Sequence, residues 1–532
     1  MPPRSSEHPA APAPPTPGTD GLHLFFARSA RLRPERTALR TATGDLTYGQ
    51  LHDDACQWAG TLLDELPGPR RVAVLARRGE TAYTGLLAAL YTGAAVVPLN
   101  PDLPPARTRA ALAQARVDAV IADEAGAALL PLVLARADSV PVLVTGPATV
   151  PGPCPGPVLR PRERLRLAAP RPVPPGAGAY LMFTSGSTGR PKGVPVSHAN
   201  ATAFLRTVLE RYRFTPEDVF SQTFDLTFDL AVFDLFAAWA SGATVVSTPW
   251  SALLDLPAFA KQHGLTVWFS TPTSIALAAR GRRLRSGSLP GLRWSLFCGE
   301  PLTVPDARLW QAAADRSRLE NLYGPTELTV ACTAHRWDPD RSPALSANKV
   351  VPIGSLFAGL TAVLLERDGR EASEEGELCV AGAQLVGGYC DPADDAGRFV
   401  HRAGRSWYRT GDLVRRIPGG EYVFLGRLDD QVKVNGWRVE LGEVEAALRS
   451  LPGVERAVAV QAPGDGGIAC FYTGTPRPPA ELKAGLAGRL PRAVLPDSVE
   501  HRDELPLTAS GKVDRHRLAG TLAGGTDPEA DA

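Results

Sequence analysis

The sequence predicts an α/β protein, and two repeating patterns carry that prediction. Short apolar runs rich in β-branched residues indicate strands at 71–76, 93–99, 118–122, 140–145, 242–247 and 265–270. They alternate with Ala- and Leu-rich stretches of helical period, such as residues 80–93. Strands separated by helices are typical of parallel sheets with crossover helices.

Length and charge narrow the class of protein. The chain has 532 residues, well beyond the roughly 100–200 of one typical domain, so we expect at least two domains. Its formal net charge of +1 lacks the basic excess of proteins that bind nucleic acids or anionic membranes. No run approaches the ~20 apolar residues of a membrane span, and no signal-peptide core is present. Seven dispersed cysteines without a CxxC pair favour reduced thiols in a cytoplasmic protein.

Composition also marks the ends of the chain and its possible breaks. Residues 1–20 are rich in Pro, Ala and Ser, which predicts a disordered tail, and 517–532 are predicted to be a flexible tail. The Pro- and Gly-rich stretch 146–179 indicates either a domain boundary or a surface excursion. A second candidate break lies near 425–430.

A loop rich in glycine and hydroxyl groups, FTSGSTGRPKG, occupies Phe183–Gly193 directly after the apolar run 179–183. It is not the common phosphate loop, because no Ser or Thr follows Lys192. Glycines free backbone N–H groups in such a loop, and hydroxyls and one ammonium add donors. These groups belong to Thr184, Ser185, Gly186, Thr188, Gly189 and Lys192. The loop therefore predicts a cradle for a polyphosphate that must enter and leave.

Four further segments follow this loop: NLYGPTE at 321–327, YRTGDL at 408–413, GRLDDQVKVNGWRVELGEVE at 426–445 and PLTASGKVDR at 506–515. Together with the loop, they make the chain resemble the adenylate-forming superfamily. This superfamily contains acyl- and aryl-CoA ligases, luciferases and the adenylation domains of nonribosomal peptide synthetases. The long form of the third segment is similar to the amino-acid-activating branch.

The resemblance implies a large N-terminal domain with layered αβαβα sheets over residues 21–425, and a small mobile α+β domain over 428–516. Asp429 matches the hinge about which the small domain turns between two half-reactions. After that turn Lys433 would face a thiol-bearing arm. Asn435 stands where the family usually has arginine or histidine.

The resemblance also implies ATP and Mg²⁺ as cofactors. Glu327 would hold Mg²⁺ against the phosphates, since a hard cation prefers oxygen ligands. Thr326 would donate to a phosphate oxygen, while Lys192 and Lys512 would meet developing negative charge. Tyr323 offers a face for adenine, and the carboxylate of Asp412 suits the two ribose hydroxyls. The full set expected to bind ATP or AMP is Thr184, Ser185, Gly186, Ser187, Thr188, Gly189, Gly299, Glu300, Pro301, Asn321, Tyr323, Gly324, Asp412, Phe424 and Arg427.

The segment FDLTFDLAVFDLF at 224–236 bears on the substrate. The family pattern F-D-x-[SA]-V-[WFM]-[ED]-[LM]-F fits Phe228–Phe236 throughout, and Asp225 fits it less well. Asp229 would then pair with the α-ammonium of an amino acid, because burying an unpaired ammonium is costly. The expected pocket walls are Leu230, Phe233, Phe269, Leu296, Cys298, Leu322, Val330 and Ala331. Because all are apolar, a charged or amide side chain is disfavoured. The two phenylalanines and three leucines leave little room, so we expect a small substrate: alanine, serine, glycine or proline, or a β-amino acid if Asp229 is displaced.

The expected function is a free-standing adenylation enzyme of natural-product biosynthesis. It would convert an amino acid and ATP into aminoacyl-AMP and pyrophosphate, then load a phosphopantetheinyl carrier protein. The 17 residues after Arg515 are too few for a carrier domain, so we expect the carrier to act in trans. One alternative is a CoA ligase of the same fold. Another is a non-catalytic relative, which would be expected to lose Lys512 or Glu327.

Overall fold

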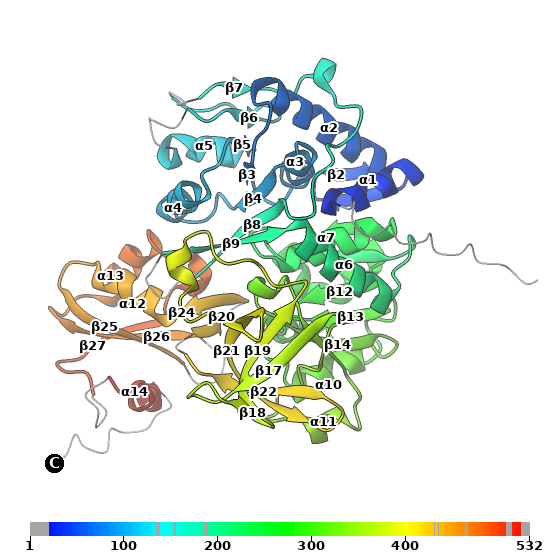
Figure 1. The fold of residues 1–532 in the computed structure, drawn as a ribbon. Coiled ribbons are helices and arrows are strands. Elements are labelled where there is room, and N and C mark those ends of the chain that lie inside the picture. The colour runs from blue at the N-terminus through cyan, green and yellow to red at the C-terminus, as the bar shows by residue number, and fades with distance from the viewer. Residues whose placement is uncertain are drawn as a thin grey trace, which may run out of the picture.

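Two large sheets and the helices packed on them form most of the chain in the computed structural model (Figure 1). The structure describes residues 21–134, 139–152, 156–185, 190–281, 283–429, 431–434, 436–462, 467–506 and 513–522. All six strand segments predicted from apolar runs contain a strand, and the predicted helix at 80–93 forms over Glu80–Tyr91.

The first sheet has seven strands in the order β7-β6-β5-β3-β4-β8-β9. All neighbours are parallel except β8 and β9, which form an antiparallel pair around the glycine-rich loop. The strands are β3 (Arg71–Leu75), β4 (Ala95–Leu99), β5 (Ala119–Ala122), β6 (Val142–Val144), β7 (Val158–Leu159), β8 (Gly178–Thr184) and β9 (Lys192–Ser197).

The second sheet has nine strands in the order β16-β15-β14-β13-β12-β10-β11-β1-β2, with a parallel centre and antiparallel edges. Its strands are β1 (Thr37–Thr41), β2 (Gly44–Thr47), β10 (Val219–Gln222), β11 (Thr244–Ser247), β12 (Val267–Ser270), β13 (Trp294–Phe297), β14 (Arg318–Tyr323), β15 (Thr333–Arg336) and β16 (Ser355–Leu356).

Helices cover both faces of both sheets, which confirms the layered αβαβα prediction. The central layer holds α1 (Leu22–Leu32), α2 (Tyr48–Glu65), α3 (Glu80–Tyr91), α6 (His198–Tyr212) and α7 (Leu230–Ser241). The outer layers hold α4 (Pro105–Ala115) and α5 (Glu124–Val133) on one side and α8 (Leu256–His263), α9 (Thr273–Arg280) and α10 (Val304–Ala313) on the other. Strand β3 shows the period of two: Val72 and Val74 face the central layer, whereas Ala73 and Leu75 face α4 and α5.

The Pro- and Gly-rich stretch 146–179 is a surface excursion and not a domain boundary. Strand β7 within it pairs with β6, and β8 after it returns to the same sheet. The stretch also packs on α2, where Leu167 donates its N–H to the Cys56 carbonyl at 3.2 Å.

A third, antiparallel sheet follows, made of β17 (Leu360–Leu365), β18 (Glu371–Ala372), β19 (Glu375–Gly382), β20 (Phe399–Arg402), β21 (Arg405–Ile417) and β22 (Glu421–Arg427). A short helix, α11 (Ser342–Leu345), precedes it.

The C-terminal part has apolar clusters of its own, centred on Val444, Leu448 and Cys470 and on Phe471. Its elements are the hairpin β23 (Gln431–Val434) and β24 (Trp437–Glu440), the sheet of β25 (Val454–Gln461), β26 (Ile468–Gly474) and β27 (Ser498–His501), and helices α12 (Leu441–Arg449), α13 (Pro479–Ala487) and α14 (Arg515–Leu522). Figure 1 shows these orange and red elements gathered on one side of the larger part. On this basis we propose a domain boundary between residues 425 and 428.

Two general features complete the fold. Within the described residues, no helix combines the length and apolar character needed to cross a bilayer. The six cysteines in the described part of the chain carry free thiols, and five of them are buried.

A buried glutamate joins the second sheet to the central helices. The side chain of Glu320 on β14 has no exposed surface and binds Arg211 of α6 at 2.8 Å and Arg336 of β15 at 2.7 Å. The hydroxyl of Tyr212 donates to it at 2.9 Å. Two cations and a hydroxyl therefore satisfy one carboxylate at the packing surface between α6 and the sheet.

The variant Glu320→Gln should lower the free energy of unfolding by about 1–3 kcal/mol, because the buried carboxylate loses its charge-assisted hydrogen bonds to Arg211 and Arg336, whose own side chains stay partly in water. The surface variant Glu375→Gln, whose carboxylate pairs with Arg415 at 3.0 Å, should cost less than about 1 kcal/mol. Urea unfolding of both variants checks the difference, and equal losses would contradict the assignment.

Candidate functional site

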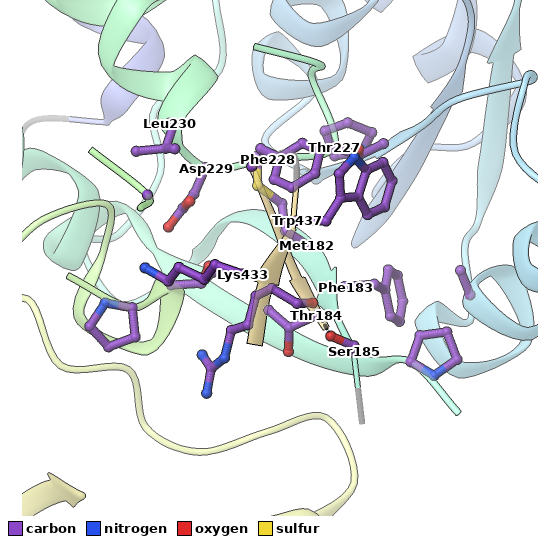
Figure 2. Close-up of a pocket in the computed structure, with 18 of the residues that line it drawn as sticks. Met182, Phe183, Thr184, Ser185, Thr227, Phe228, Asp229, Leu230, Lys433 and Trp437 are labelled. Carbon is purple, nitrogen blue, oxygen red and sulfur yellow. Dashed lines mark hydrogen bonds between the residues drawn. The ribbon is translucent and has the colours of Figure 1, made fainter. Parts of the chain in front are cut away.

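A cavity of about 120 Å³ opens where several strands of both large sheets end. It is bounded by the end of β8, the turn before α7, the end of β14 and the β23–β24 hairpin. Carboxyl ends of parallel strands are a common place for a ligand site in open α/β sheets. Figure 2 shows side chains from these separate segments converging on one space.

The cavity brings together eleven of the residues singled out from the sequence: Thr184, Ser185, Asp229, Leu230, Gly299, Tyr323, Gly324, Thr326, Asp412, Arg427 and Lys433. Gly186, Ser187, Thr188, Gly189, Asn435 and Lys512 lie outside the described residues. Within the described part of the chain, no residue after Arg438 lines this cavity.

Close backbone approach explains one glycine of the NLYGPTE segment. A Cβ added at Gly324 would lie 2.6 Å from the Cα of Ala331 and 2.8 Å from the nitrogen of Cys332. Neither backbone atom can move aside cheaply, so this position requires glycine. The close contact places Tyr323 and Thr326 at the cavity wall.

Asp412 is buried and both its oxygens are bound. The Tyr323 hydroxyl donates to one oxygen at 2.5 Å, and the Arg427 guanidinium donates to the other at 2.7 Å. Asp412 lies on β21 and Arg427 on β22, which pair in register at these two residues. The third sheet therefore holds a carboxylate at the cavity through its own strand pairing.

Glu327 lies beside the cavity with 1% of its surface exposed. It accepts a hydrogen bond from the Tyr389 hydroxyl at 2.5 Å and pairs with Arg438 at 3.0 Å. Burial alone would raise the pKa of Glu327, but the Arg438 guanidinium and the Tyr389 hydroxyl outweigh burial and lower it. Lys192 is buried close by, with its ammonium 5.5 Å from the centre of the Tyr389 ring.

Asp229 stands at the start of α7 and is 7% exposed. Burial raises its pKa to about 6, and hydrogen bonds from the Val330 N–H and the Thr326 hydroxyl limit the rise. The Val330 bond measures 3.1 Å. Asp225 lies elsewhere: its oxygens are bound by Asn100 and Thr227, and it does not line this cavity. Of the two aspartates, Asp229 therefore lines this cavity and Asp225 does not.

The backbone that aims the Val330 N–H at Asp229 is strained. Thr329 and Val330 have φ values of +58° and +71°, which are unfavourable for β-branched residues. The Gln384 amide holds this turn by donating to the carbonyls of Leu328, Thr329 and Ala331, at 3.0, 3.3 and 2.7 Å. Strained backbone that the surroundings hold in place is frequent at functional sites.

Most of the expected pocket walls belong to the core instead of lining the cavity. Four of them have no exposed surface and do not line the cavity: Phe233, Phe269, Leu296 and Cys298. The centroids of the Phe233 and Phe269 rings are 4.6 Å apart, and Phe233 lies about one helical turn after Asp229 on α7. Leu322, Val330 and Ala331 are likewise buried outside the lining, which leaves only Leu230 beside Asp229.

Other residues expected to bind ATP also lie away from the cavity in this arrangement. Asn321 donates to the Pro352 carbonyl at 2.9 Å and is part of the sheet edge. Phe424 packs on the core, and Pro301 is exposed. Glu300 accepts hydrogen bonds from Thr273 and from the Gly436 N–H, the latter at 2.6 Å.

The β23–β24 hairpin closes the cavity with residues that the sequence reasoning passed over. The Trp437 ring packs on Phe228 with centroids 4.7 Å apart (Figure 2). Arg438 pairs with Glu327, and its carbonyl accepts a hydrogen bond from the Ser185 hydroxyl. Trp437 and Arg438 lie inside the segment 426–445, and Phe228 begins the segment 228–236. Their residue types alone do not indicate a role. Figure 2 also shows Lys433 across the cavity from Asp229, and burial lowers the pKa of Lys433.

A second cavity of about 220 Å³ adjoins the first and shares Phe228, Gly436 and Trp437 with it. Its outer part includes Trp250, of which 53% is exposed. The Phe228–Trp437 pair therefore stands where the two cavities meet.

Comparison with known proteins agrees with this geometry. Residues 26–390 match the AMP-binding enzyme family, and residues 443–512 match the AMP-binding enzyme C-terminal domain. The chain is 35% identical over 501 residues to an L-proline–[L-prolyl-carrier protein] ligase of Streptomyces coelicolor, covering 89% of this chain and 91% of the relative.

Two solved structures are similar over nearly the whole chain. IdnL7 is 47% identical with a TM-score of 0.74, and 95% of this chain and 99% of IdnL7 are covered. The adenylation domain AlmE of Vibrio cholerae, solved with glycyl-adenosine-5'-phosphate, is 29% identical with a TM-score of 0.83, covering 95% and 98%. The chain therefore belongs to the AMP-binding enzyme family and is an AMP-forming ligase of the adenylate-forming superfamily.

Proposed function

We propose that this enzyme activates a small amino acid with ATP and then transfers it to the phosphopantetheine thiol of a separate carrier protein. The observation that carries the proposal is Asp229, a buried carboxylate at the cavity with no ion pair within the described residues. An α-ammonium is the partner that such a group lacks. The names of the S. coelicolor ligase and of the AlmE complex support an amino acid as substrate.

In the first half-reaction, a carboxylate oxygen of the amino acid attacks the α-phosphorus of ATP. The bond from that phosphorus to the bridging oxygen breaks, and pyrophosphate leaves with the electron pair. Thr184, Ser185 and Thr326 line the cavity and would donate to phosphate oxygens. Lys512, which lies outside the described residues, is proposed to meet the charge that builds at the substrate carboxylate.

The residues present fit a bound Mg²⁺. Glu327 is buried and kept ionised, and such a carboxylate suits a hard cation. Within the described residues no three acidic, His or Cys side chains gather as a metal cage, which suits an ion that arrives with the phosphates of ATP. When bound, Mg²⁺ would neutralise part of the negative charge on the phosphates.

Nucleoside binding would fall to Tyr323 and Asp412. Both line the cavity, and the two oxygens of Asp412 could accept the two ribose hydroxyls once Tyr323 and Arg427 shift. Arg427 also pairs with Asp429, and Arg398 donates to Asp429 at 2.9 Å. We propose that this cluster fixes the hinge at Asp429.

The amino acid itself should be glycine, alanine or serine in preference to proline. Phe233 lies about one helical turn after Asp229 and packs on Phe269, and we propose that this pair of rings limits the room for the substrate side chain. Apolar walls also disfavour a charged or amide side chain, because its polar groups would lose water without finding partners.

In the second half-reaction, the carrier's thiolate sulfur attacks the carbonyl carbon of the adenylate. The bond from that carbon to the phosphate oxygen breaks, AMP leaves, and the thiol proton passes to solvent. We propose that the thiol arm reaches the adenylate through the second cavity, past Phe228 and Trp437. Gly436 and Trp437 of the hairpin line both cavities, and Lys433, which lines the first, would face the arm where it reaches the adenylate.

Pyrophosphate exchange with the twenty common amino acids and β-alanine tests the first step. Exchange should be strongest with glycine, alanine or serine. Transfer of the radiolabelled amino acid to a phosphopantetheinyl carrier, compared with coenzyme A, tests the second. Thioester on coenzyme A alone, or no exchange with any amino acid, would contradict the proposal.

The variant Phe233→Ala should move the preference toward leucine-sized substrates. It removes a buried ring about one helical turn from Asp229, and one methylene in an apolar pocket is worth ~1–3 kcal/mol of discrimination. Pyrophosphate exchange with alanine, proline, leucine and phenylalanine measures the change. Phe259→Ala, a half-buried phenylalanine outside both cavities, serves as control. An unchanged rank order in Phe233→Ala would show that this ring does not limit substrate size.

Amino acid binding should weaken as the pH falls through about 6. Burial raises the pKa of Asp229 to about 6, so acid converts the ionised carboxylate that pairs with the ammonium into its neutral form. The KM for the amino acid should therefore rise between pH 7 and pH 5, approaching tenfold per unit below the pKa. Asp229→Asn should have a high KM without this inflection. A KM for the wild type that stays flat over this range would exclude Asp229 as the ammonium partner.

A further inference from the structure

One tyrosine contacts both the carboxylate proposed to hold the metal and the lysine of the phosphate loop. Tyr389 lies in the connection between β19 and β20 and is 7% exposed. Its hydroxyl donates to the Oε1 atom of Glu327 at 2.5 Å. The Lys192 ammonium lies over its ring, 5.5 Å from the ring centre, and Lys192 is buried as well. A single side chain therefore stands between an anion and a cation that come from separate segments of the chain.

The two contacts use different parts of the tyrosine. The hydroxyl acts as the donor to Glu327, because an ionised carboxylate only accepts hydrogen bonds. It leaves the Oε2 atom of Glu327 for a cation, and in this structure that atom lies 3.0 Å from the Arg438 guanidinium. The ring attracts the Lys192 ammonium through the negative face of its π system, and this attraction strengthens where water is excluded. The hydroxyl therefore acts on the carboxylate, and the ring acts on the lysine.

The backbone on each side of Tyr389 is bound to the same two segments. The Val386 N–H donates to the Glu327 carbonyl at 3.1 Å. The Cys390 N–H donates to the carbonyl of Gly193, the residue after Lys192, at 2.8 Å. The chain around the tyrosine thus spans from the turn that carries the carboxylate to the strand that carries the lysine.

The position of the tyrosine is itself fixed by its neighbours. Its N–H donates to the Oδ1 atom of Asp395 at 2.8 Å, and its ring packs edge-to-face on Phe399 of β20 with centroids 5.4 Å apart. Gly388, directly before it, has a φ of +137°, and a Cβ added there would lie 2.8 Å from the Oδ2 atom of Asp395. Glycine at 388 therefore allows the close approach of the carboxylate that holds the tyrosine backbone.

We propose that Tyr389 is a positioning residue that sets the spacing between the carboxylate of Glu327 and the ammonium of Lys192. This inference rests on the proposed function, because it takes Glu327 to meet the metal and Lys192 to meet the phosphates of ATP. The hydroxyl holds the carboxylate in place for the metal, and the ring holds the ammonium in place for the phosphates. Groups that are held in place before a ligand arrives lose less conformational freedom when it binds.

Binding of α,β-methylene-ATP, measured by calorimetry with Mg²⁺ or with EDTA, separates the two contacts without turnover. Tyr389→Phe removes the hydroxyl and keeps the ring, so its affinity in EDTA should stay near that of the wild type. The gain in affinity from Mg²⁺ should fall by about fivefold or more in this variant, the lower end of ordinary coupling between two ligands. Tyr389→Leu removes the ring as well, so its affinity in EDTA should also fall.

Tyr48→Phe is the matched control. The Tyr48 hydroxyl is buried on α2 and donates to the Ala243 carbonyl at 2.6 Å, and no residue of α2 lines either cavity. This variant loses one buried hydroxyl hydrogen bond, as Tyr389→Phe does. Its nucleotide affinity should match that of the wild type with Mg²⁺ and with EDTA.

A double-mutant cycle isolates the action of the ring on Lys192. Lys192→Met should weaken nucleotide binding in EDTA. Because the ring acts through the ammonium, adding Tyr389→Leu to Lys192→Met should weaken this binding little further. A general loss of structure would instead weaken binding by the same factor in both backgrounds.

Pyrophosphate exchange extends the test to the reaction. Tyr389→Phe should raise the Mg²⁺ concentration that gives the half-maximal rate. The KM for the amino acid should stay unchanged, because Tyr389 does not contact Asp229, the proposed partner of the ammonium. Thermal unfolding identifies a variant that fails to fold, and if Tyr389→Leu does so, Tyr389→Phe decides alone.

Two results would overturn the inference. One is a gain in affinity from Mg²⁺ that is as large in Tyr389→Phe as in the wild type. The other is an equal loss of affinity from Tyr389→Leu with and without the Lys192 ammonium. Absence of pyrophosphate exchange with every amino acid in the wild type would instead contradict the proposed function, and the calorimetric binding would still judge Tyr389.

Discussion

Three buried carboxylates around one small cavity set the conditions that the rest of the site must meet. Each is neutralised differently. Asp412 has a guanidinium and a phenol from the enzyme itself, and Glu327 has a guanidinium from the C-terminal hairpin. Within the described residues, Asp229 accepts hydrogen bonds from the N–H groups of Val330 and Leu230 and from the Thr326 hydroxyl but has no cation beside it, and burial raises its pKa. From Asp412 to Glu327 to Asp229, the large domain itself supplies less neutralisation of the carboxylate. The three carboxylates are therefore increasingly available to a ligand in that order.

The supporting structure follows from that need for charge balance. The third sheet holds Asp412 and Arg427 opposite each other by strand register. The turn at Thr329 and Val330 accepts unfavourable backbone angles because Gln384 satisfies its carbonyls, and the result is a donor aimed at Asp229. The C-terminal hairpin adds its own cation. Elements from four places in the chain thus form the walls of one cavity of about 120 Å³.

Much of this could be predicted from the sequence, because strands and motif segments are local. The apolar runs predicted six strands, and the segment at 228–236 pointed to Asp229, which lines the cavity. Local patterns do not report how side chains from distant strands fill a shared space. The packing of Phe233 on Phe269 and the pairing of Arg438 with Glu327 join residues 36 and 111 positions apart. The strained turn at Thr329 and Val330 could not be predicted for the same reason, because the residue that holds it, Gln384, is more than fifty residues away in the sequence.

If the packed rings of Phe233 and Phe269 limit the size of the substrate, as proposed, there is a consequence for fidelity. A wall of packed rings acts as a sieve with an upper size limit and no lower one, because a smaller substrate always fits. Rejecting a substrate that lacks one methylene gains only ~1–3 kcal/mol, so near neighbours in size are poorly separated by binding alone. An enzyme with such a wall is faithful only if the supply of small amino acids, or the step that consumes the loaded carrier, makes the finer choice. The accuracy of amino-acid selection would then depend on the whole biosynthetic sequence of reactions and not on this enzyme alone.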